Sequence, residues 1–371
     1  MRENQDNNSD KFPAIFIMGP TATGKTALAM ELVEKIAGEI ISVDSAMIYR
    51  GMDIGTGKPT STEIANIPHH LIDIRDPGAT YSAAEFCQDA FTSMREITQR
   101  GKIPILVGGT LLYFRALEQG LSQLPSADLA TRAEILKQAN LFGWQAMHQR
   151  LAEIDPLVAS KIHPNDPQRI QRALEVYEIT KQPMSSFWHM NSDNPPMNSH
   201  NTPMNDRDET FPLSVSKTHL PAEIKKYRLH KFVILPRDRA ELHRRIEIRF
   251  HQMLKAGLLT EVETLYRRAD LHLNLPSMRA VGYRQIWQYF DECIHPSHHD
   301  KHDPESLLFQ LMIQKSIAAT RQLAKRQLTW LRNSSLTIPS NGLNSIHYLE
   351  MENSYLDSLR TMVHCCVVNQ V

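Results

Sequence analysis

Short apolar runs alternate with amphipathic segments over the first part of the chain. The runs Ala14–Met18, Glu39–Val43 and Ile103–Val107 have the length and the β-branched content of buried strands. The segments Thr26–Ala37 and Ser82–Arg100 carry apolar residues at helical spacing. Strands that alternate with helices in this way predict a parallel, doubly wound α/β sheet.

The pattern changes after Pro125, where helical spacing continues without strands. Helices are predicted over residues 129–140, 143–154 and 167–181. One further strand is predicted over 232–235, and helices follow over 240–256, 258–268, 277–291 and 304–332. The predicted fold class is α/β, a parallel sheet core with an inserted all-helical arm and additional C-terminal helices.

Composition divides the chain further. Five Asn lie between Asn191 and Asn205 with Pro195, Pro196 and Pro203 among them, a composition that buries little apolar area. The predicted parts are a disordered N-terminus (1–12), the first part of the core (13–124), the helical arm (125–183), a flexible linker or insertion (184–226), a core return strand with basic helices (227–335) and a peripheral tail (336–371).

The charge of the chain is balanced only as a sum. The 371 residues contain 41 Lys and Arg and 41 Asp and Glu, but residues 225–335 contain 20 basic and 11 acidic side chains, a net charge of +9. Such asymmetry indicates either a face that binds nucleic acid or phosphate, or a set of solvated Arg-rich helices.

Several classes of protein are excluded by what the sequence lacks. It has no uninterrupted apolar run of about 18 residues, so no membrane span is expected. The polar first twelve residues do not resemble a secretory signal. Four cysteines without a C-x-x-C pair argue against a zinc ribbon or a disulfide framework, and favour a cytoplasmic location.

One phosphate-binding motif lies between the first predicted strand and the first predicted helix. It has the form G-x-x-x-x-G-K-[ST] and consists of Gly19, Pro20, Thr21, Ala22, Thr23, Gly24, Lys25 and Thr26. Its backbone N–H groups and the helix N-terminus attract phosphate oxygens, Lys25 adds a cation, and the Thr26 hydroxyl can bind Mg²⁺. The motif does not distinguish ATP or GTP from a prenyl diphosphate.

Two further strand ends carry polar or glycine residues. Asp44 follows the second predicted strand, and Gly108–Thr110 follows the third. Ligands of parallel sheets bind at the carboxyl ends of the strands, so these residues are expected to share a site with the phosphate loop. Asp44 can hold Mg²⁺, act as a general base or cap a turn. Gly108–Thr110 can approach the phosphates or form a capped turn.

Basic and amide side chains cluster on three predicted helices. Gln168 and Arg172 share a helix face suited to base edges and phosphates. Arg245 and Arg249 are also four apart and can bind an anion together. A third helix carries a set suited to a phosphate backbone, namely Arg321, Lys325 and Arg326. Solvated surface helices are the alternative interpretation for each.

Taken together, these features resemble the tRNA dimethylallyltransferase (tRNA isopentenyltransferase) family of bacterial type. The likeness runs in order over about residues 13–332, and two strings are highly specific, Asp-Ser-x-x-x-Tyr-x-Gly-Met-Asp-Ile-Gly-Thr at 44–56 and His-Pro-Asn-Asp-x-x-Arg at 163–169. The segments that carry it are 19–26, 42–56, 58–59, 69, 71–77, 107–113, 124–128, 163–169, 279–284, 320–327 and 330–332.

The resemblance implies transfer of a dimethylallyl group from dimethylallyl diphosphate to N6 of the adenosine 3′ to the anticodon of tRNA. It implies Mg²⁺ as cofactor, a monomer, and a helical arm that grips the anticodon stem-loop. Lys25, Asp44 and Thr110 are the expected catalytic residues, with Asp44 as general base. Arg245 or Arg249 is expected to join the phosphate loop in binding the diphosphate.

The family likeness also implies a set of tRNA contacts. Besides Asp44 and Thr110, it comprises Ser45, Ala46, Met47, Arg132, Gln168, Arg169, Ile170, Gln171, Arg172, Arg279, Ala280, Val281, Gly282, Tyr283 and Arg284. The basic helix at 321–326 is expected to add salt-sensitive binding.

Two alternatives belong to other classes of protein. A P-loop nucleotide kinase or ATPase would use Lys25 and Thr26 equally well, but the sequence shows no clear lid arginine pattern or base-specificity motif. An RNA-binding protein without catalysis would have lost Lys25, Asp44 or Thr110, and all three are present.

Overall fold

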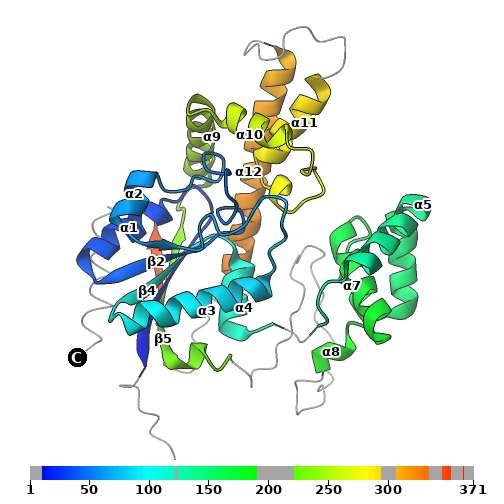
Figure 1. Cartoon of the computed structure of the whole chain (residues 1–371), viewed down its shortest axis with the longest axis horizontal. Coiled ribbons are helices and arrows are strands. Elements are labelled where there is room, and N and C mark those ends of the chain that lie inside the picture. Colours follow the sequence, from blue (N-terminus) through cyan, green and yellow to red (C-terminus); the bar gives the residue numbers. More distant parts are fainter. Residues whose placement is uncertain are drawn as a thin grey trace, which may run out of the picture. The chain divides into compact units, whose positions relative to one another are not determined.

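The computed structural model describes residues 11–121, 124–189, 221–293, 306–333, 345–351 and 362 (Figure 1). The chain divides into two compact units, one formed by Met1–Glu118 with Glu223–Val371 and the other by Gln119–Ala222. The second unit is therefore an insertion in the sequence of the first. No helix in the described ranges is long and apolar enough to cross a membrane.

The first unit is built on a six-stranded sheet in the order β3-β2-β4-β1-β5-β6. Every pairing between its described strands is parallel. The strands are β1 (Phe12–Met18), β2 (Gly38–Val43), β3 (His69–His70), β4 (Ile103–Gly108), β5 (Tyr227–Leu235) and β6 (Ser345–Glu350). This confirms the α/β class and the parallel sheet predicted from the alternating pattern.

Register places three strand ends side by side. Gly108 of β4 is the partner of Met18 on one side and of Val43 on the other. The residues that follow these strands therefore leave the sheet at one edge. The sequence predicted this convergence, and it fixes where the functional site lies.

Side chains of the central strand alternate between the two faces of the sheet. Ala14, Phe16 and Met18 pack with the helices α3 (Ala83–Gln99) and α4 (Leu111–Gln119). Ile15 and Ile17 pack with α1 (Lys25–Lys35) on the opposite face. All five strand residues are fully buried, so a continuous apolar run is the pattern that a sheet covered on both faces requires.

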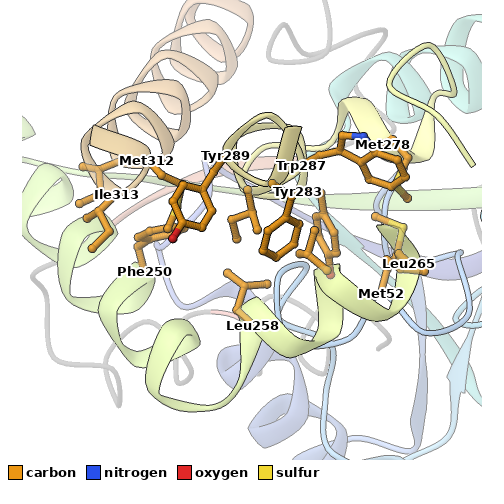
Figure 2. Packing of buried hydrophobic residues seen from close by; sticks show 14 of the residues in the cluster. Met52, Phe250, Leu258, Leu265, Met278, Tyr283, Trp287, Tyr289, Met312 and Ile313 are labelled. Atoms are coloured by element: carbon orange, nitrogen blue, oxygen red, sulfur yellow. The ribbon is translucent and has the colours of Figure 1, made fainter. Parts of the chain in front are cut away.

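A third core lies among the later helices of the same unit. It joins α9 (Arg239–Lys255), α10 (Leu258–Tyr266), α11 (Tyr283–Cys293) and α12 (Leu307–Asn333) with residues from the loop after β2. Figure 2 shows Met52 of that loop with Phe250, Leu258, Tyr283 and Met312 in this cluster.

The shorter elements of the unit are α2 (Ser61–Asn66) and the 3₁₀ turns at Ile224–Lys226 and Ser277–Arg279.

The second unit is helical as predicted. Its elements are α5 (Leu129–Ile154), α6 (Pro156–Ala159), α7 (Pro167–Thr180) and α8 (Ser186–His189). The two helices predicted over 129–140 and 143–154 form one element with a break at Gly143, whose φ of 81° and ψ of 156° are not helical. Glycine tolerates this conformation because it has no Cβ.

Three predicted boundaries are corrected. The tail after Asn333 is not wholly peripheral, since β6 pairs with β5 along six residues from Ser345 to Glu350. The first strand begins at Phe12, inside the stretch expected to be disordered, and residues 1–10 lie outside the described ranges. The predicted linker is packed at both ends, where Met184 and Ile224 are buried. Residues 190–220 of that linker lie outside the described ranges.

Candidate active site

A cavity of about 720 Å³ opens at the edge where β1, β2 and β4 end. The phosphate loop, the loops after β2 and β4, and the helices α9 and α12 all contribute to its lining. Parallel strands with a glycine-rich turn place backbone N–H groups and a helix N-terminus at this edge. The cavity is therefore suited to an anion at the end formed by the phosphate loop.

The phosphate loop is held by close backbone contacts. Gly24 has a left-handed φ of 81° at the N-terminus of α1, a conformation that favours glycine. A Cβ at Gly19 would lie 2.8 Å from the carbonyl oxygen of Ile234 in β5, so a side chain there would displace the loop. The Thr23 hydroxyl donates to the carbonyl of Pro20 at 2.9 Å, which closes the turn.

Two cations share the anion end of the cavity. The amine of Lys25 donates to the carbonyl of Pro20 at 2.5 Å. The guanidinium of Arg249 donates to Thr21 Oγ1 at 3.3 Å and to the carbonyl of Thr56 at 3.2 Å. Burial, and next the positive charge of Arg249, lower the pKa of Lys25 to about 7, although Asp44 acts in the opposite direction. Burial also lowers the pKa of Arg249. Like charges held together in this way favour an anionic ligand between them.

The structure separates the two candidate arginines of α9. Arg245 donates to Glu241 Oε1 at 2.9 Å and does not line the cavity. Arg249 lies one turn further along the helix and does line it. Spacing alone placed both on one face, but the neighbouring carboxylate of Glu241 pairs with Arg245. The anion end of the cavity contains Arg249 and not Arg245.

Asp44 and Thr110 are connected through Ser45, which follows Asp44 and hydrogen-bonds to Thr110. Asp44 Oδ1 accepts hydrogen bonds from the backbone N–H groups of Ala46 at 2.8 Å and Met47 at 3.3 Å. Thr110 Oγ1 accepts from the N–H of Ser45 at 3.1 Å. The predicted turn cap is present, but Asp44 also lines the cavity, so one carboxylate oxygen caps while the group faces the ligand space. These contacts fix the Asp44 side chain with respect to the end of β4.

Gln327 of α12 is a cavity residue that the sequence interpretation missed. Its Oε1 accepts from the N–H of Thr21 at 2.9 Å, and its Nε2 donates to the carbonyl of Gly109 at 2.9 Å. Only charged residues of this helix, Arg321, Lys325 and Arg326, were expected to bind a ligand, and Gln327 is neutral. A signal was present, because Gln327 falls among the buried residues Ala324, Leu328 and Leu331 at helical spacing.

The segment at 279–284 forms part of the cavity wall. Tyr283 is fully buried, and its hydroxyl donates to Glu261 Oε1 at 2.6 Å. The Glu261 carboxylate also accepts from the N–H groups of Asp53, Ile54 and Gly55, at 2.9, 2.7 and 3.1 Å. Tyr283 thereby supports the loop after β2. The members of the segment that line the cavity are Arg279, Ala280, Val281, Gly282 and Tyr283, whereas Arg284 is exposed and does not.

The basic side chains of α12 differ in their surroundings. Arg321 donates to Glu247 at 2.8 Å, so an acidic neighbour offsets part of its charge. Lys325 and Arg326 are exposed, and Arg326 also lines the cavity. Lys325 and Arg326 are therefore the cations of this set that best suit a polyanion.

In the second unit, two residues predicted to contact tRNA, Arg132 and Arg172, form ion pairs within the protein. Arg132 donates to Glu175 at 2.9 and 3.2 Å, and Arg172 donates to the same carboxylate at 2.6 Å and to the carbonyl of Pro125 at 2.6 Å. Glu175 is completely buried. Burial alone would raise its pKa, but the bonds from Arg132 and Arg172 and from the Asp128 N–H outweigh it, so the pKa is lowered.

The neighbours of Arg172 on α7 have different positions. Ile170 is completely buried, so its side chain is part of the helical core and the expectation of an RNA contact is corrected. Gln171 donates to the carbonyl of Arg132 at 3.1 Å, and Arg169 pairs with Asp166 at 3.3 Å. Gln168 is exposed. Gln168 is thus the member of this segment most accessible to a ligand.

A phosphate loop, two cavity cations and a carboxylate at a neighbouring strand end are features of an α/β enzyme whose cavity suits a phosphate group. The chain belongs to the IPP transferase family, whose sequence profile matches residues 47–334. It is accordingly a prenyltransferase, and a nucleotide kinase or ATPase is not favoured.

Solved structures agree with the family assignment. The full-length tRNA isopentenylpyrophosphate transferase from Bacillus halodurans is 30% identical, with 97% of each chain covered and a TM-score of 0.59. A tRNA isopentenylpyrophosphate transferase from Staphylococcus epidermidis is 31% identical over 96% of this chain and 99% of that one, with a TM-score of 0.58. A eukaryotic dimethylallyltransferase acting on tRNA shares the fold, at 24% identity over 96% of this chain and 79% of that one, with a TM-score of 0.66.

Proposed function

We propose that the protein transfers a dimethylallyl group from dimethylallyl diphosphate to N6 of the adenosine 3′ to the anticodon in tRNA. The observation that carries the proposal is one cavity with a doubly cationic anion site and a carboxylate, supplied by Lys25, Arg249 and Asp44. The two bacterial relatives described above are named as tRNA isopentenylpyrophosphate transferases, which supports tRNA as the acceptor.

The proposed reaction is a single displacement. The lone pair of N6 attacks the allylic C1 carbon, the C1–O bond breaks, and diphosphate leaves with the bonding electrons. An exocyclic adenine amine is a weak nucleophile, so one of its two protons must be removed as the N6–C1 bond forms, and this proton passes to the carboxylate of Asp44. The adenosine has to leave its stack to enter a cavity of this kind.

The anion end of the cavity stabilises the leaving group, diphosphate. The phosphate-loop N–H groups, the Lys25 amine and the Arg249 guanidinium are fixed before the reaction, so they stabilise the charge that builds on diphosphate without reorganising. Binding of the diphosphate also raises the pKa of Lys25, because the anion offsets its burial and its repulsion by Arg249.

Mg²⁺ is the proposed cofactor, and Thr26 is the residue that would hold it. Thr26 lines the cavity next to Lys25, and Asp44 offers a second oxygen donor in the same lining. Within the described ranges no group of three or more His, Cys, Asp or Glu residues could hold a metal ion, so the remaining ligands would be diphosphate oxygens and water. When bound there, the ion would neutralise charge on the leaving group.

The proposed partners are tRNA and dimethylallyl diphosphate, with a cytoplasmic monomer as the working form. Lys325 and Arg326 supply exposed positive charge in the first unit, and Gln168 an exposed amide in the second. These side chains suit the phosphates and bases of an anticodon stem-loop.

The test is direct. Purified protein is incubated with dimethylallyl diphosphate, Mg²⁺ and unmodified tRNA, and the tRNA nucleosides are analysed by mass spectrometry. We expect an N6-dimethylallyl adenosine with the wild type and none above background with Asp44→Asn. The absence of this nucleoside in the wild-type reaction, and in tRNA from cells that contain the protein, would reject the proposal.

A further inference from the structure

The side-chain amide of Gln327 joins two loops that are far apart in the sequence. Thr21, whose N–H binds the amide oxygen, is 306 residues away, and Gly109, whose carbonyl binds the amide nitrogen, is 218 residues away. Thr21 belongs to the phosphate loop, and Gly109 precedes Thr110. The amide thus connects the diphosphate end of the cavity with the end of β4.

The two partners fix the orientation of the amide. An amide oxygen only accepts and an amide nitrogen only donates, so rotation by 180° would place like groups against each other. Gly109 permits the approach because a Cβ there would lie 2.5 Å from the Gln327 nitrogen. Both partner groups belong to the backbone, so the contact determines the position of the loops themselves.

Each loop also contacts a residue of the proposed reaction or its direct neighbour. On one side, the hydroxyl of Thr21 contacts Arg249, one of the two cavity cations. On the other side, the hydroxyl of Thr110 contacts the N–H of Ser45, which follows Asp44. Gln327 therefore adds a side-chain link between the anion site and the carboxylate, beyond the pairing of β4 with β1 and β2.

We infer that Gln327 is a positioning residue for prenyl transfer, which sets the distance between the bound diphosphate and the Asp44–Thr110 strand ends. The inference rests on the proposed function. The allylic carbon is fixed by the diphosphate, and the attacking amine by the opposite loop, so a shift between the loops changes the attack distance. Misplacement by about 1 Å costs on the order of 100-fold in rate.

The packing of α12 does not depend on this amide. Ala324, Leu328 and Leu331 are buried on the same helix and supply its apolar contacts. Loss of the amide leaves the Thr21 N–H and the Gly109 carbonyl beside a cavity that water can enter. Rate is thus expected to fall much more than stability.

Gln327→Met removes both hydrogen bonds at nearly constant side-chain size. We expect kcat to fall on the order of 10- to 100-fold, with tRNA affinity and the melting temperature close to wild type. Gln322→Met is the matched control, because Gln322 is exposed on the same helix and is not part of the cavity lining. Wild-type kcat in Gln327→Met, or a loss matched by the loss of folded protein, would overturn the inference.

Gln327→Glu gives a signature that a merely structural role would not. An ionised carboxylate can accept from the Thr21 N–H but cannot donate to the Gly109 carbonyl, whereas a protonated one can do both. At saturating dimethylallyl diphosphate, the ratio of variant to wild-type kcat should rise as the pH falls toward the pKa of a carboxyl group. A ratio that is constant with pH would overturn the inference.

The wild-type reaction separates the two claims. If the wild type transfers no dimethylallyl group to tRNA, the proposed function fails whatever Gln327 does. If the wild type transfers it and Gln327→Met does so at the same rate, the positioning role alone fails.

Discussion

Lys25 and Arg249 come from distant parts of the sequence and line the same cavity. Lys25 lies at the start of α1, and Arg249 in the middle of α9. Burial and the charge of Arg249 lower the pKa of Lys25 to about 7, so the amine of the unliganded protein changes its charge near neutral pH. Affinity for an anion is consequently linked to pH.

Diphosphate binding should weaken as the pH rises above about 7. In that range Lys25 is largely neutral, and the anion must draw a proton onto the amine as it binds. We expect the Kd of inorganic diphosphate in the wild type to rise with pH by up to about tenfold per unit, measured relative to Lys25→Met. Calorimetry over about pH 6 to 9 measures both proteins, and the variant corrects for titration of the ligand. Equal slopes would contradict the prediction.

The same pKa predicts an effect on stability. The pKa of Lys25 is about 7 in the folded protein against an ordinary value of 10.5, so the unfolded state binds more protons between these values. The contribution of this residue to stability therefore rises with pH across that window. Below about pH 7, Lys25→Met should melt at a higher temperature than the wild type in the absence of anions. A lower melting temperature would contradict this.

Asp44→Asn should abolish transfer while preserving the local fold. The amide oxygen of asparagine can still accept from the Ala46 and Met47 N–H groups, so the turn after β2 is retained. The amide cannot take up the amine proton, and kcat should fall on the order of 10²- to 10⁴-fold. Single-turnover assays with tRNA give the rate, and tRNA affinity within a few fold of wild type is the control. Normal transfer would exclude Asp44 as the base.

Arg249 and Arg245 form a matched pair on one helix. Arg249→Met removes a cavity cation that contacts Thr21, so the KM for dimethylallyl diphosphate should rise on the order of tenfold or more. Arg245→Met removes a partner of Glu241 outside the cavity and should leave KM near wild type. Steady-state kinetics decide the question, and a larger effect at Arg245 would reverse the assignment.

Glu175→Gln should destabilise the second unit. The neutral amide weakens the bonds from Arg132 and Arg172 within a buried site, at a cost of about 2 kcal/mol in the free energy of unfolding. The pKa of Glu175 is lowered in the folded protein, so its stabilising contribution is present above the carboxyl pKa of the unfolded chain and is lost as the pH falls. Urea unfolding at neutral and acidic pH should show a difference between the proteins that narrows in acid.

Binding of tRNA should depend on salt through α12. Replacing Lys325 or Arg326 with Ala is expected to reduce the slope of log K against log salt by about one each. Arg321→Ala should have a smaller effect, because Glu247 already offsets part of that charge. Titrations over a range of potassium chloride concentrations measure the slopes. Unchanged slopes for all three variants would show that these residues are solvated surface charges that do not contact tRNA.

The sequence predicted the parts of the site that depend on local pattern. The phosphate loop and the ends of β2 and β4 follow from strand length, glycine spacing and the rule that parallel strands end together. Ile170 could also have been predicted as buried, since it shares helical spacing with Ala173 and Leu174.

What the sequence could not predict depends on tertiary neighbours. The choice between Arg245 and Arg249 follows from Glu241 on one side and Thr21 on the other. The role of Gln327 follows from two backbone groups in distant loops. The strands β3 and β6 lie at the edges of the sheet, where a short or half-exposed strand has little hydrophobic pattern.

The close approach of Gly19 to Ile234 has a consequence for synthesis of the protein. The loop precedes the Gln119–Ala222 unit in the sequence, whereas the strand that supports it, β5, follows the whole of that unit. Because domains emerge in order from the ribosome, the inserted helices can fold before β5 pairs with β1. The nascent chain therefore carries an incomplete anion site until β5 has been made, and competence to bind diphosphate is acquired when two distant segments of one chain come together.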